Sequence, residues 1–196
     1  TTNTGDAEGE VLQTRPVTPE QVNAERIAQA CAQWTGPIEQ IPPMHSALKH
    51  QGKALYEYAR EGIEIDRPSR QVTIHHIDIL NWQGDVLELD VQCSKGTYIR
   101  TLAQDIGESL GCGAHLIGLR RTGSGGVTLN GAVTLDALAS MSEAERDTHL
   151  LPADILLSDW PEVLLSESEA ARFLTGLRRR TRLADAPQVR VYGPHP

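Results

Sequence analysis

The sequence predicts an α+β fold in which a mixed, largely antiparallel sheet is flanked by helices. The clearest strand signal lies in residues 86–93, where Leu87, Leu89, Val91 and Cys93 alternate with polar residues at period two. Apolar residues at helical spacing recur before this strand and directly after it. The 196 residues are 39% hydrophobic, which is enough for one good core and a small second one.

A helix is predicted near the start of the chain, after a loop and short strand in residues 1–14. Thr18-Pro19-Glu20-Gln21 combines a capping box with proline at the first helical position. The helix should run to about Trp34, because Gly36-Pro37 ends it. Its apolar stripe consists of Val22, Ile27, Ala30, Cys31 and Trp34.

Residues 43–71 lack the periodic apolar residues that mark a core-facing element. They are predicted to form a polar insertion with one short helix near residues 55–60. Five basic side chains stand against four acidic ones, which leaves a net charge of +1. A long polar insertion of this kind is usually functional or disordered. The alternative is a solvated charge run, since the two signs nearly cancel. The basic residues are Lys49, Lys53, Arg60, Arg67 and Arg70.

Residues 72–82 and 86–93 are predicted to pair as an antiparallel hairpin that turns at Gln83-Gly84-Asp85. The alternation slips near His75-His76-Ile77, which indicates a β-bulge. The two histidines would face opposite sides of a strand, so at most one could enter any site. We assign them no role.

The most informative stretch is residues 93–102. If the strand continues to Arg100, the side chains of Tyr98 and Arg100 project to the same side. A helix should then begin at about Thr101, which has capping-box spacing to Gln104. Tyrosine offers a flat face and a hydroxyl, and arginine a fork for carboxylate or phosphate, so the pair suits a planar anionic or nucleotide-like ligand. The alternative is a half-buried tyrosine beside a surface arginine.

The rest of the chain alternates short elements with turns. Residues 111–125 combine a glycine-punctuated turn, a short apolar strand and the pair Arg120-Arg121. A closing strand is predicted at residues 127–129, and Thr134 and Ser142 should cap two short helices. A linker at residues 150–161 leads to a helix capped by Ser166. A basic run at residues 178–182 then precedes a strand at residues 189–192.

The net charge of −8 is unevenly distributed. Residues 94–125 carry four basic and two acidic side chains, and residues 171–196 carry six and one. Residues 126–170, in contrast, carry one basic and nine acidic side chains. The positive segments are therefore residues 43–71, residues 94–125 and the C-terminal end. Contact with a polyanion would require such positive segments.

Composition argues against several classes of protein. The three cysteines include no Cys-x-x-Cys pair, so a disulfide framework is not expected. Cys112 and His115 have the spacing of half a zinc site but lack a second half, so no metal site is predicted. No apolar run approaches the length of a membrane helix, and residues 1–12 do not resemble a signal peptide. We therefore expect a cytoplasmic protein without membrane contact.

Three motifs occur in order over about 80 residues. Residues 41–49 read Ile-Pro-Pro-Met-His-Ser-Ala-Leu-Lys, and residues 95–102 read Lys-Gly-Thr-Tyr-Ile-Arg-Thr-Leu. Residues 113–122 contain Gly-Ala-His-Leu and Leu-Arg-Arg-Thr. Together they resemble the bacterial tRNA pseudouridine synthases that modify the T-loop uridine, the pseudouridine-55 synthase family, and the chain is identified as a member of it.

The resemblance implies a domain organisation and a substrate. Residues 1–158 would be the later part of a pseudouridine synthase catalytic domain, with an RNA-binding thumb loop at about residues 43–71. Residues 159–196 would begin a C-terminal PUA-like RNA-binding β domain. The partner would be the T-arm stem-loop of tRNA, no metal or other cofactor would be needed, and the full-length enzyme would be a monomer.

The resemblance also implies residue roles. Tyr98 would stack on the flipped uridine and assist proton transfer, and Arg100 would pair with the nucleophilic carboxylate. Leu119 would form an apolar wall, and Lys95 would also contact the substrate. The residues assigned to RNA contact are Lys49, Lys53, Arg60, Arg120 and Arg121.

One departure from the family pattern concerns the nucleophile. In the family this is an aspartate in a segment close to Gly-His-Thr-Gly-Ala-Leu-Asp-Pro, which does not occur in the 196 residues. We therefore expect the later part of a longer enzyme, which forms no pseudouridine alone. Asp6 in a polar loop, and Asp105 and Glu108 on the helix after Arg100, are no clear substitutes. The alternative is a non-catalytic RNA-binding fragment.

Overall fold

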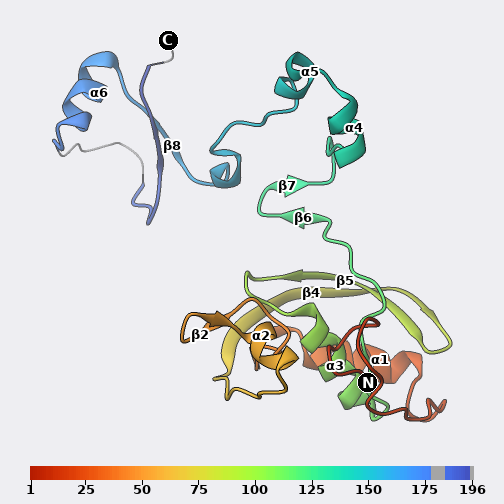
Figure 1. The fold of residues 1–196 in the computed structure, drawn as a ribbon. Coiled ribbons are helices and arrows are strands. Elements are labelled where there is room, and N and C mark those ends of the chain that lie inside the picture. The colour runs from red at the N-terminus through yellow and green to blue at the C-terminus, as the bar shows by residue number, and fades with distance from the viewer. Residues whose placement is uncertain (178–183, 195–196) are drawn as a thin grey trace. The chain divides into compact units, whose positions relative to one another are not determined.

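The computed structural model describes residues 1–177 and 184–194 and divides the chain into two compact units, Thr1–Leu119 and Arg120–Pro196. In the first unit, α1 and α3 lie side by side against one face of a sheet (Figure 1). This arrangement confirms the predicted α+β class. The elements of the unit are α1 (Ala24–Gln33), β1 (Gly36–Gln40), β2 (Lys49–His50), β3 (Lys53–Ala54), α2 (Leu55–Arg60), β4 (Arg70–Gln83), β5 (Val86–Cys93) and α3 (Ile99–Leu110).

The sheet has the strand order β1-β4-β5 and is antiparallel throughout. The β4–β5 hairpin is the predicted one, and a register shift between Ile74 and His76 confirms the predicted bulge. A second shift lies between Ile79 and Asn81. Strand β1 pairs with the first residues of β4, from Gly36 opposite Ile74 to Gln40 opposite Arg70. This pairing brings β1 to the end of the sheet where β5 stops.

The core of the first unit lies between this sheet and the two helices. Ile74 is 0% exposed, and Ile27 of α1 and Leu102 of α3 are each 1% exposed. Trp34 packs against the same cluster and donates its indole N–H to Ser109 Oγ at 2.9 Å. The predicted apolar stripes of both helices therefore face one another and the sheet.

Helix α1 begins at Ala24, so the predicted start near Thr18 was wrong. The Asn23 side chain accepts the Arg26 N–H at 3.1 Å and caps the helix. The Thr18 carbonyl instead accepts the N–H groups of Gln21 and Val22 in a turn. The asparagine is the better-placed cap because it stands directly before the first helical residue.

Residues 43–71 contain more structure than their polar composition predicts. Strands β2 and β3 pair, and α2 follows β3 directly. Ala54 is 7% exposed and Leu55 is 3% exposed, so this segment buries a small apolar group of its own. The short helix predicted near residues 55–60 is confirmed as α2.

The second unit consists of short elements. They are β6 (Gly123–Ser124), β7 (Val127–Thr128), α4 (Leu135–Ser140), α5 (Glu143–Asp147), the 3₁₀ helix η1 (Ile155–Leu157), β8 (Glu162–Leu164), α6 (Glu167–Leu174) and β9 (Arg190–Tyr192). The strand predicted at residues 127–129 is present as β7, and Gly125, at φ +60°, turns the chain so that it pairs with β6.

Caps and strand pairing in the second unit follow from local sequence. Thr134 and Ser142 cap α4 and α5 as predicted, and Ser166 with Glu169 forms a capping box at α6. Strands β8 and β9 pair in parallel. The predicted basic run at residues 178–182 lies outside the described residues. Among the helices that are described, none has the length and apolarity needed to cross a membrane.

Candidate active site

A turn at residues 94–97 carries the chain from β5 into α3. The Thr97 hydroxyl donates to the Ser94 carbonyl at 2.9 Å, and Gly96 takes a left-handed φ of +85°. Ser94 Oγ accepts the Thr73 N–H at 2.9 Å, which fastens the turn to β4. Strand β5 ends at Cys93. The prediction that an extended strand reaches Arg100 was therefore wrong, because this turn intervenes.

Gln40, the last residue of β1, fixes the start of α3. It is 2% exposed, and its Oε1 accepts the Tyr98 N–H at 3.0 Å while its Nε2 donates to the Tyr98 carbonyl at 3.3 Å. Tyr98 is the extended N-cap residue, with φ −96° and ψ 106°. The helix therefore begins at Ile99, two residues before the predicted Thr101. The side chain that fixes this N-cap residue comes from the distant strand β1.

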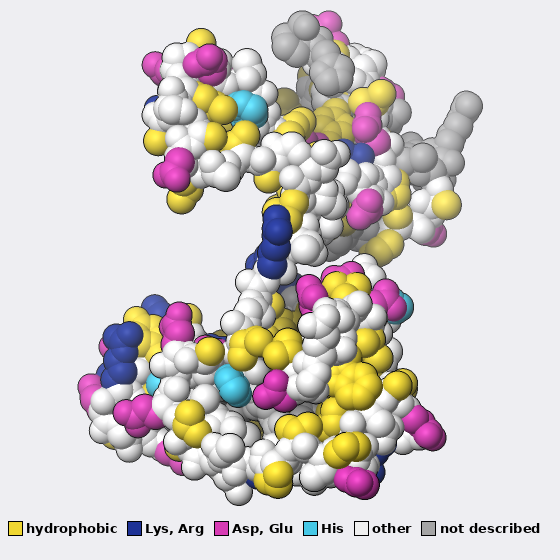
Figure 2. All heavy atoms as spheres, turned by 90° about the vertical axis from the view of Figure 1, so that its right-hand side faces the viewer, with side chains coloured by type: hydrophobic (Ala, Val, Ile, Leu, Met, Phe, Trp, Pro, Cys, Tyr) yellow, Lys and Arg dark blue, Asp and Glu magenta, His cyan; other side chains and the backbone are white. Residues whose placement is uncertain are grey.

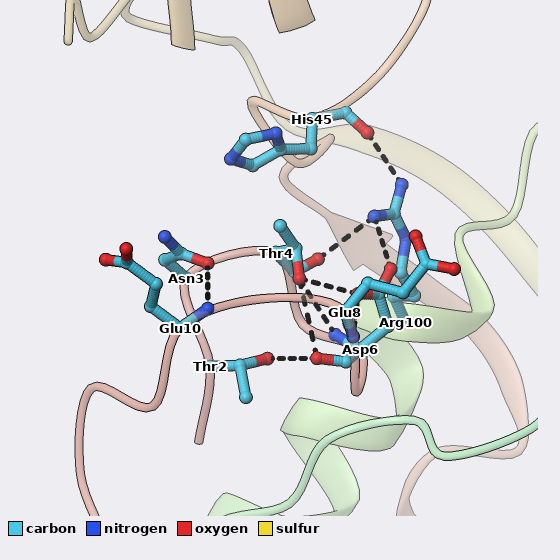
Figure 3. A network of polar contacts seen from close by, with 8 residues as sticks. All are labelled: Thr2, Asn3, Thr4, Asp6, Glu8, Glu10, His45 and Arg100. Carbon is cyan, nitrogen blue, oxygen red and sulfur yellow. Dashed lines mark hydrogen bonds and ion pairs between the residues drawn. The ribbon is translucent and has the colours of Figure 1, made fainter. Parts of the chain in front are cut away.

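The guanidinium of Arg100, in the first turn of α3, joins three segments of the chain (Figure 3). Nη1 donates to the Thr4 carbonyl at 3.1 Å and to Asp6 Oδ2 at 2.9 Å. Nη2 donates to the His45 carbonyl at 2.6 Å. The side chain is 25% exposed. Arg100 is thus held in a fixed orientation by one carboxylate and two backbone carbonyls.

Asp6 is the acidic partner that sequence reasoning missed. Its Oδ1 accepts the Thr4 hydroxyl at 2.6 Å and the Glu8 N–H at 3.2 Å. The hydrogen bond from Thr4 lowers the pKa of Asp6, and Glu8 and Arg100 lower it further against the opposing effect of burial. The carboxylate is therefore ionised at neutral pH. The signal that could have found it is the turn-forming run Asn3-Thr4-Gly5-Asp6.

The motif at residues 113–116 holds Asp6 in place. The Leu116 N–H donates to the Gly5 carbonyl at 3.0 Å, and the Ala7 N–H donates to the Leu116 carbonyl at 2.9 Å. These bonds form an isolated parallel bridge between Asp6 and Leu116. The short apolar strand predicted here is therefore a single bridge. Its effect is to fix the backbone on both sides of the carboxylate that Arg100 binds.

The remaining predicted substrate residues are less closely joined to this cluster. Tyr98 is half-buried at the helix start, and Lys95 is exposed in the preceding turn. Leu119 is 67% exposed, and Arg120 and Arg121 are exposed residues of the second unit. In the described part of the chain, no hydrogen bond or ion pair joins Lys95 to Arg100. The roles assigned to these residues stay predictions.

Two of the three basic residues predicted to contact RNA in residues 43–71 already have partners. Lys53 Nζ lies 2.5 Å from Glu61 Oε1 and 4.6 Å from the Tyr58 ring centroid, and the Arg60 guanidinium lies 5.1 Å from the Tyr56 ring centroid. Lys49 is exposed. On the face of the first unit in Figure 2, Lys and Arg side chains gather toward one edge, whereas acidic side chains are scattered. Their contact with RNA stays a prediction.

Residues 1–99 match the family model described as TruB family pseudouridylate synthase, N-terminal domain. Residues 100–158 match the model of the tRNA pseudouridylate synthase B C-terminal domain. The chain is 54% identical over 200 residues to tRNA pseudouridine synthase B of Ralstonia pickettii, covering 98% of this chain and 61% of the relative. It is 50% identical to the protein of that name from Verminephrobacter eiseniae, covering 100% and 60%.

Two solved structures share the fold. A chain of a Cbf5-Nop10-Gar1 complex matches with a TM-score of 0.64 at 26% identity, covering 84% of this chain and 46% of that one. A chain of an H/ACA RNP bound to a substrate RNA containing 2′-deoxyuridine matches with a TM-score of 0.58 at 24% identity, covering 80% and 44%. The second likeness concerns the fold alone. The chain spans about three fifths of the length of the bacterial relatives it matches.

Proposed function

Because the chain belongs to the TruB family of pseudouridylate synthases, we propose that it supplies Tyr98 and Arg100 to an enzyme that converts the T-loop uridine of tRNA, uridine 55, to pseudouridine. The observation that carries the proposal is the Arg100 guanidinium, held by Asp6 and two carbonyls at the helix start that presents Tyr98. The name of the bacterial relatives supports tRNA as the substrate.

The reaction is an isomerisation that needs no external oxidant or reductant. The uridine leaves the loop, its N1–C1′ bond breaks, and a C5–C1′ bond forms after the uracil turns. C5 loses a proton and N1 gains one. Tyr98 stacks on the uracil and its hydroxyl assists this proton transfer. Arg100 donates three hydrogen bonds to described residues. Two of its five N–H groups therefore remain for the carboxylate of the nucleophile.

Asp6 is a supporting group in this proposal. Its Oδ2 accepts from Arg100 and its Oδ1 accepts from Thr4 and Glu8, so both oxygens are occupied. The nucleophile is instead an aspartate in a segment of the Gly-His-Thr-Gly-Ala-Leu-Asp-Pro type, which the 196 residues do not contain. The 196-residue chain alone would bind T-arm RNA weakly and leave its glycosidic bonds intact.

The test compares two proteins on one RNA. The 196-residue chain, and the same chain preceded by the N-terminal segment of the Ralstonia pickettii relative, are incubated with an unmodified T-arm stem-loop. Pseudouridine is then measured in the digested RNA. We expect product from the extended protein only, and a rate at least about a hundredfold lower when it carries Arg100→Gln.

Two outcomes would contradict the proposal. Product from the 196-residue chain, abolished by Asp6→Asn, would make Asp6 the nucleophile. No product from either protein, with RNA binding intact in both, would leave the chain as a non-catalytic RNA-binding module.

A further inference from the structure

Gln40 is a buried polar side chain whose described hydrogen bonds both go to the backbone of one residue, Tyr98. The side chain is 2% exposed. Its Oε1 accepts the Tyr98 N–H at 3.0 Å, and its Nε2 donates to the Tyr98 carbonyl at 3.3 Å. That carbonyl also accepts the Leu102 N–H at 3.0 Å, which is the first hydrogen bond of α3. Both ends of the Gln40 amide therefore contact the residue that precedes the helix.

These contacts take the place of a local cap at the start of α3. Tyr98 occupies the N-cap position, but its side chain accepts no hydrogen bond from the helix. The hydroxyl of Thr97, one residue earlier, donates to the Ser94 carbonyl instead. Among the described contacts, the side chain that selects the first residue of α3 is therefore Gln40 of β1.

The residue at which α3 begins determines the backbone conformation of Tyr98, and with it the direction of its ring. Tyr98 is extended, with φ −96° and ψ 106°. Successive residues of an α-helix are rotated by about 100° around its axis, so a Tyr98 drawn into the helix would point its ring elsewhere. Arg100 would keep its place, because three acceptors hold its guanidinium. A shifted helix start would therefore misplace Tyr98 relative to Arg100.

The short segment from Gln40 to His45 contacts both members of this pair. The Gln40 amide binds the Tyr98 backbone, and the His45 carbonyl accepts Arg100 Nη2 at 2.6 Å (Figure 3). Pro42-Pro43 lies between these two contacts, and the first of the prolines is buried. Because each proline ring fixes φ near about −65°, the segment has few alternative conformations. It therefore acts as a stiff spacer between the group that holds Tyr98 and the group that holds Arg100.

We propose that Gln40 is a positioning residue for pseudouridine formation, which holds Tyr98 in the orientation that brings its ring and hydroxyl to the uracil. This role rests on the proposed function, whereas the hydrogen bonds between Gln40 and Tyr98 do not. Gln40 acts on the uridine only through Tyr98. Its loss should therefore slow the chemical step more than it weakens RNA binding, because most of the affinity for RNA comes from contacts with phosphates.

The first test measures the single-turnover rate and the RNA affinity of the N-terminally extended protein on an unmodified T-arm stem-loop. Gln40→Met removes both hydrogen bonds at nearly constant volume. It should lower the rate at least about tenfold and change the affinity less than about twofold, because a small misplacement of a reacting group costs rate more than binding. Gln71→Met is the matched control, since Gln71 is an exposed residue of β4, the strand that pairs with β1. An equal loss of rate in both variants would overturn the inference.

The second test uses Gln40→Glu, whose hydrogen bonding depends on pH. Its carboxylate can accept the Tyr98 N–H but cannot donate to the carbonyl, whereas the protonated form offers one donor and one acceptor. Burial raises the pKa of a carboxyl group at this position. The rate relative to the wild type should therefore rise at least about threefold as the pH falls from about 8 to about 6, while the relative rate of Gln40→Met stays constant. If Gln40→Met does not fold, this profile decides the question, and a constant relative rate of Gln40→Glu would overturn the inference.

A third measurement needs no activity and separates this inference from the proposed function. Amide hydrogen exchange of the 196-residue chain is followed by NMR, and thermal unfolding checks that each variant is folded. The Tyr98 N–H should exchange at least about tenfold faster in Gln40→Met than in the wild type or in Gln71→Met, because it loses its acceptor.

The outcomes are distinct. Unchanged exchange of the Tyr98 N–H in Gln40→Met would overturn the inference, and so would faster exchange with an unchanged rate of pseudouridine formation. Faster exchange together with an extended wild-type protein that forms no product would contradict the proposed function and support the contact between Gln40 and Tyr98.

Discussion

The Asp6–Arg100 ion pair differs from an ordinary surface pair in how its two members are held. Each side chain is about one quarter exposed. Asp6 also accepts from Thr4 and Glu8, and Arg100 also donates to two backbone carbonyls. Isolated exposed pairs contribute little, but a network whose partners are fixed by backbone loses less side-chain entropy. The pair should therefore stabilise the first unit measurably.

Asp6→Asn should lower the free energy of unfolding at pH 7 by about 1 kcal/mol. The folded-state pKa of Asp6 lies below its unfolded value, which is about 3.9 for aspartate. The carboxylate's contribution is therefore complete above the unfolded pKa and is lost as the pH falls through the folded pKa. Urea unfolding of both proteins between about pH 2 and 7 should show the stability difference shrinking below about pH 4.

Asp85→Asn provides the control for this titration, because Asp85 is exposed in the β4–β5 turn. Its stability difference from the wild type should be small. Curves for Asp6→Asn and the wild type that stay parallel across the whole pH range would show that the Asp6 charge contributes nothing.

At the residue scale, the sequence singled out Tyr98 and Arg100 but not the contacts that hold Arg100. Tyr98 and Arg100 were found because their motif is contiguous. The groups that hold Arg100 are Thr4, Asp6 and His45, which lie 96, 94 and 55 residues away. Two of the three acceptors are backbone carbonyls, which every residue possesses. No pattern of residue types could have singled them out.

At the element scale, α3 makes direct backbone contact with the turn that follows it. A Cβ added at Gly107 would lie 2.3 Å from the Ala114 nitrogen and 2.4 Å from the Gly113 carbonyl carbon. The Gly113 N–H donates to the Gly107 carbonyl at 2.9 Å. This approach leaves no room for a side chain, and the same turn leads to Leu116 and the bridge to Asp6.

Gly107→Ala should therefore destabilise the first unit by about 1–3 kcal/mol, because the clash outweighs the gain in helix propensity of up to about 1 kcal/mol. Gly118→Ala is the matched control, since a Cβ there has nothing within 4 Å. It should change the free energy of unfolding by less than about 0.5 kcal/mol. Equal unfolding midpoints for the two variants would contradict the close packing of α3 on this turn.

The elements that were predicted well are those determined by residues close together in the sequence. The β4–β5 hairpin and its bulge follow from alternation within a few residues, and α6 follows from its own capping box. The starts of α1 and α3 were misplaced for different reasons. At α1 a competing cap, Asn23, stood closer to the helix than Thr18. At α3 the N-cap residue is Tyr98, and the side chain that fixes it is Gln40 of β1, 58 residues away.

At the scale of the whole chain, the division between the two units falls between Leu119 and Arg120. Arg120 and Arg121 are exposed and lie outside helices and strands. Brief digestion with trypsin should therefore yield a stable product that ends at one of these arginines, identified by intact mass. Arg100 should be spared, because its guanidinium is held by three acceptors. Early cleavage at Arg26, within α1, would show that Thr1–Leu119 does not form a compact unit.

The domain boundary predicted at residue 158 stays a prediction. It rests on the family resemblance, whereas the division at residues 119–120 rests on which residues contact one another. Alternation and capping signals do not report which elements share a core, so this division could not be predicted from sequence.

The contacts of Arg100 also bear on the order in which the molecule assembles. The β4–β5 hairpin and the α3 that follows it can form through contacts between neighbours in the chain. The guanidinium, in contrast, finds its acceptors only after loops of 55 to 96 residues have closed. Because long closures lose chain entropy before any contact compensates for it, they come late in folding. The core needs closures of the same length, because it packs Ile27 of α1 with Leu102 of α3. We therefore expect the contacts of Arg100 to form together with the core and after the local hairpin.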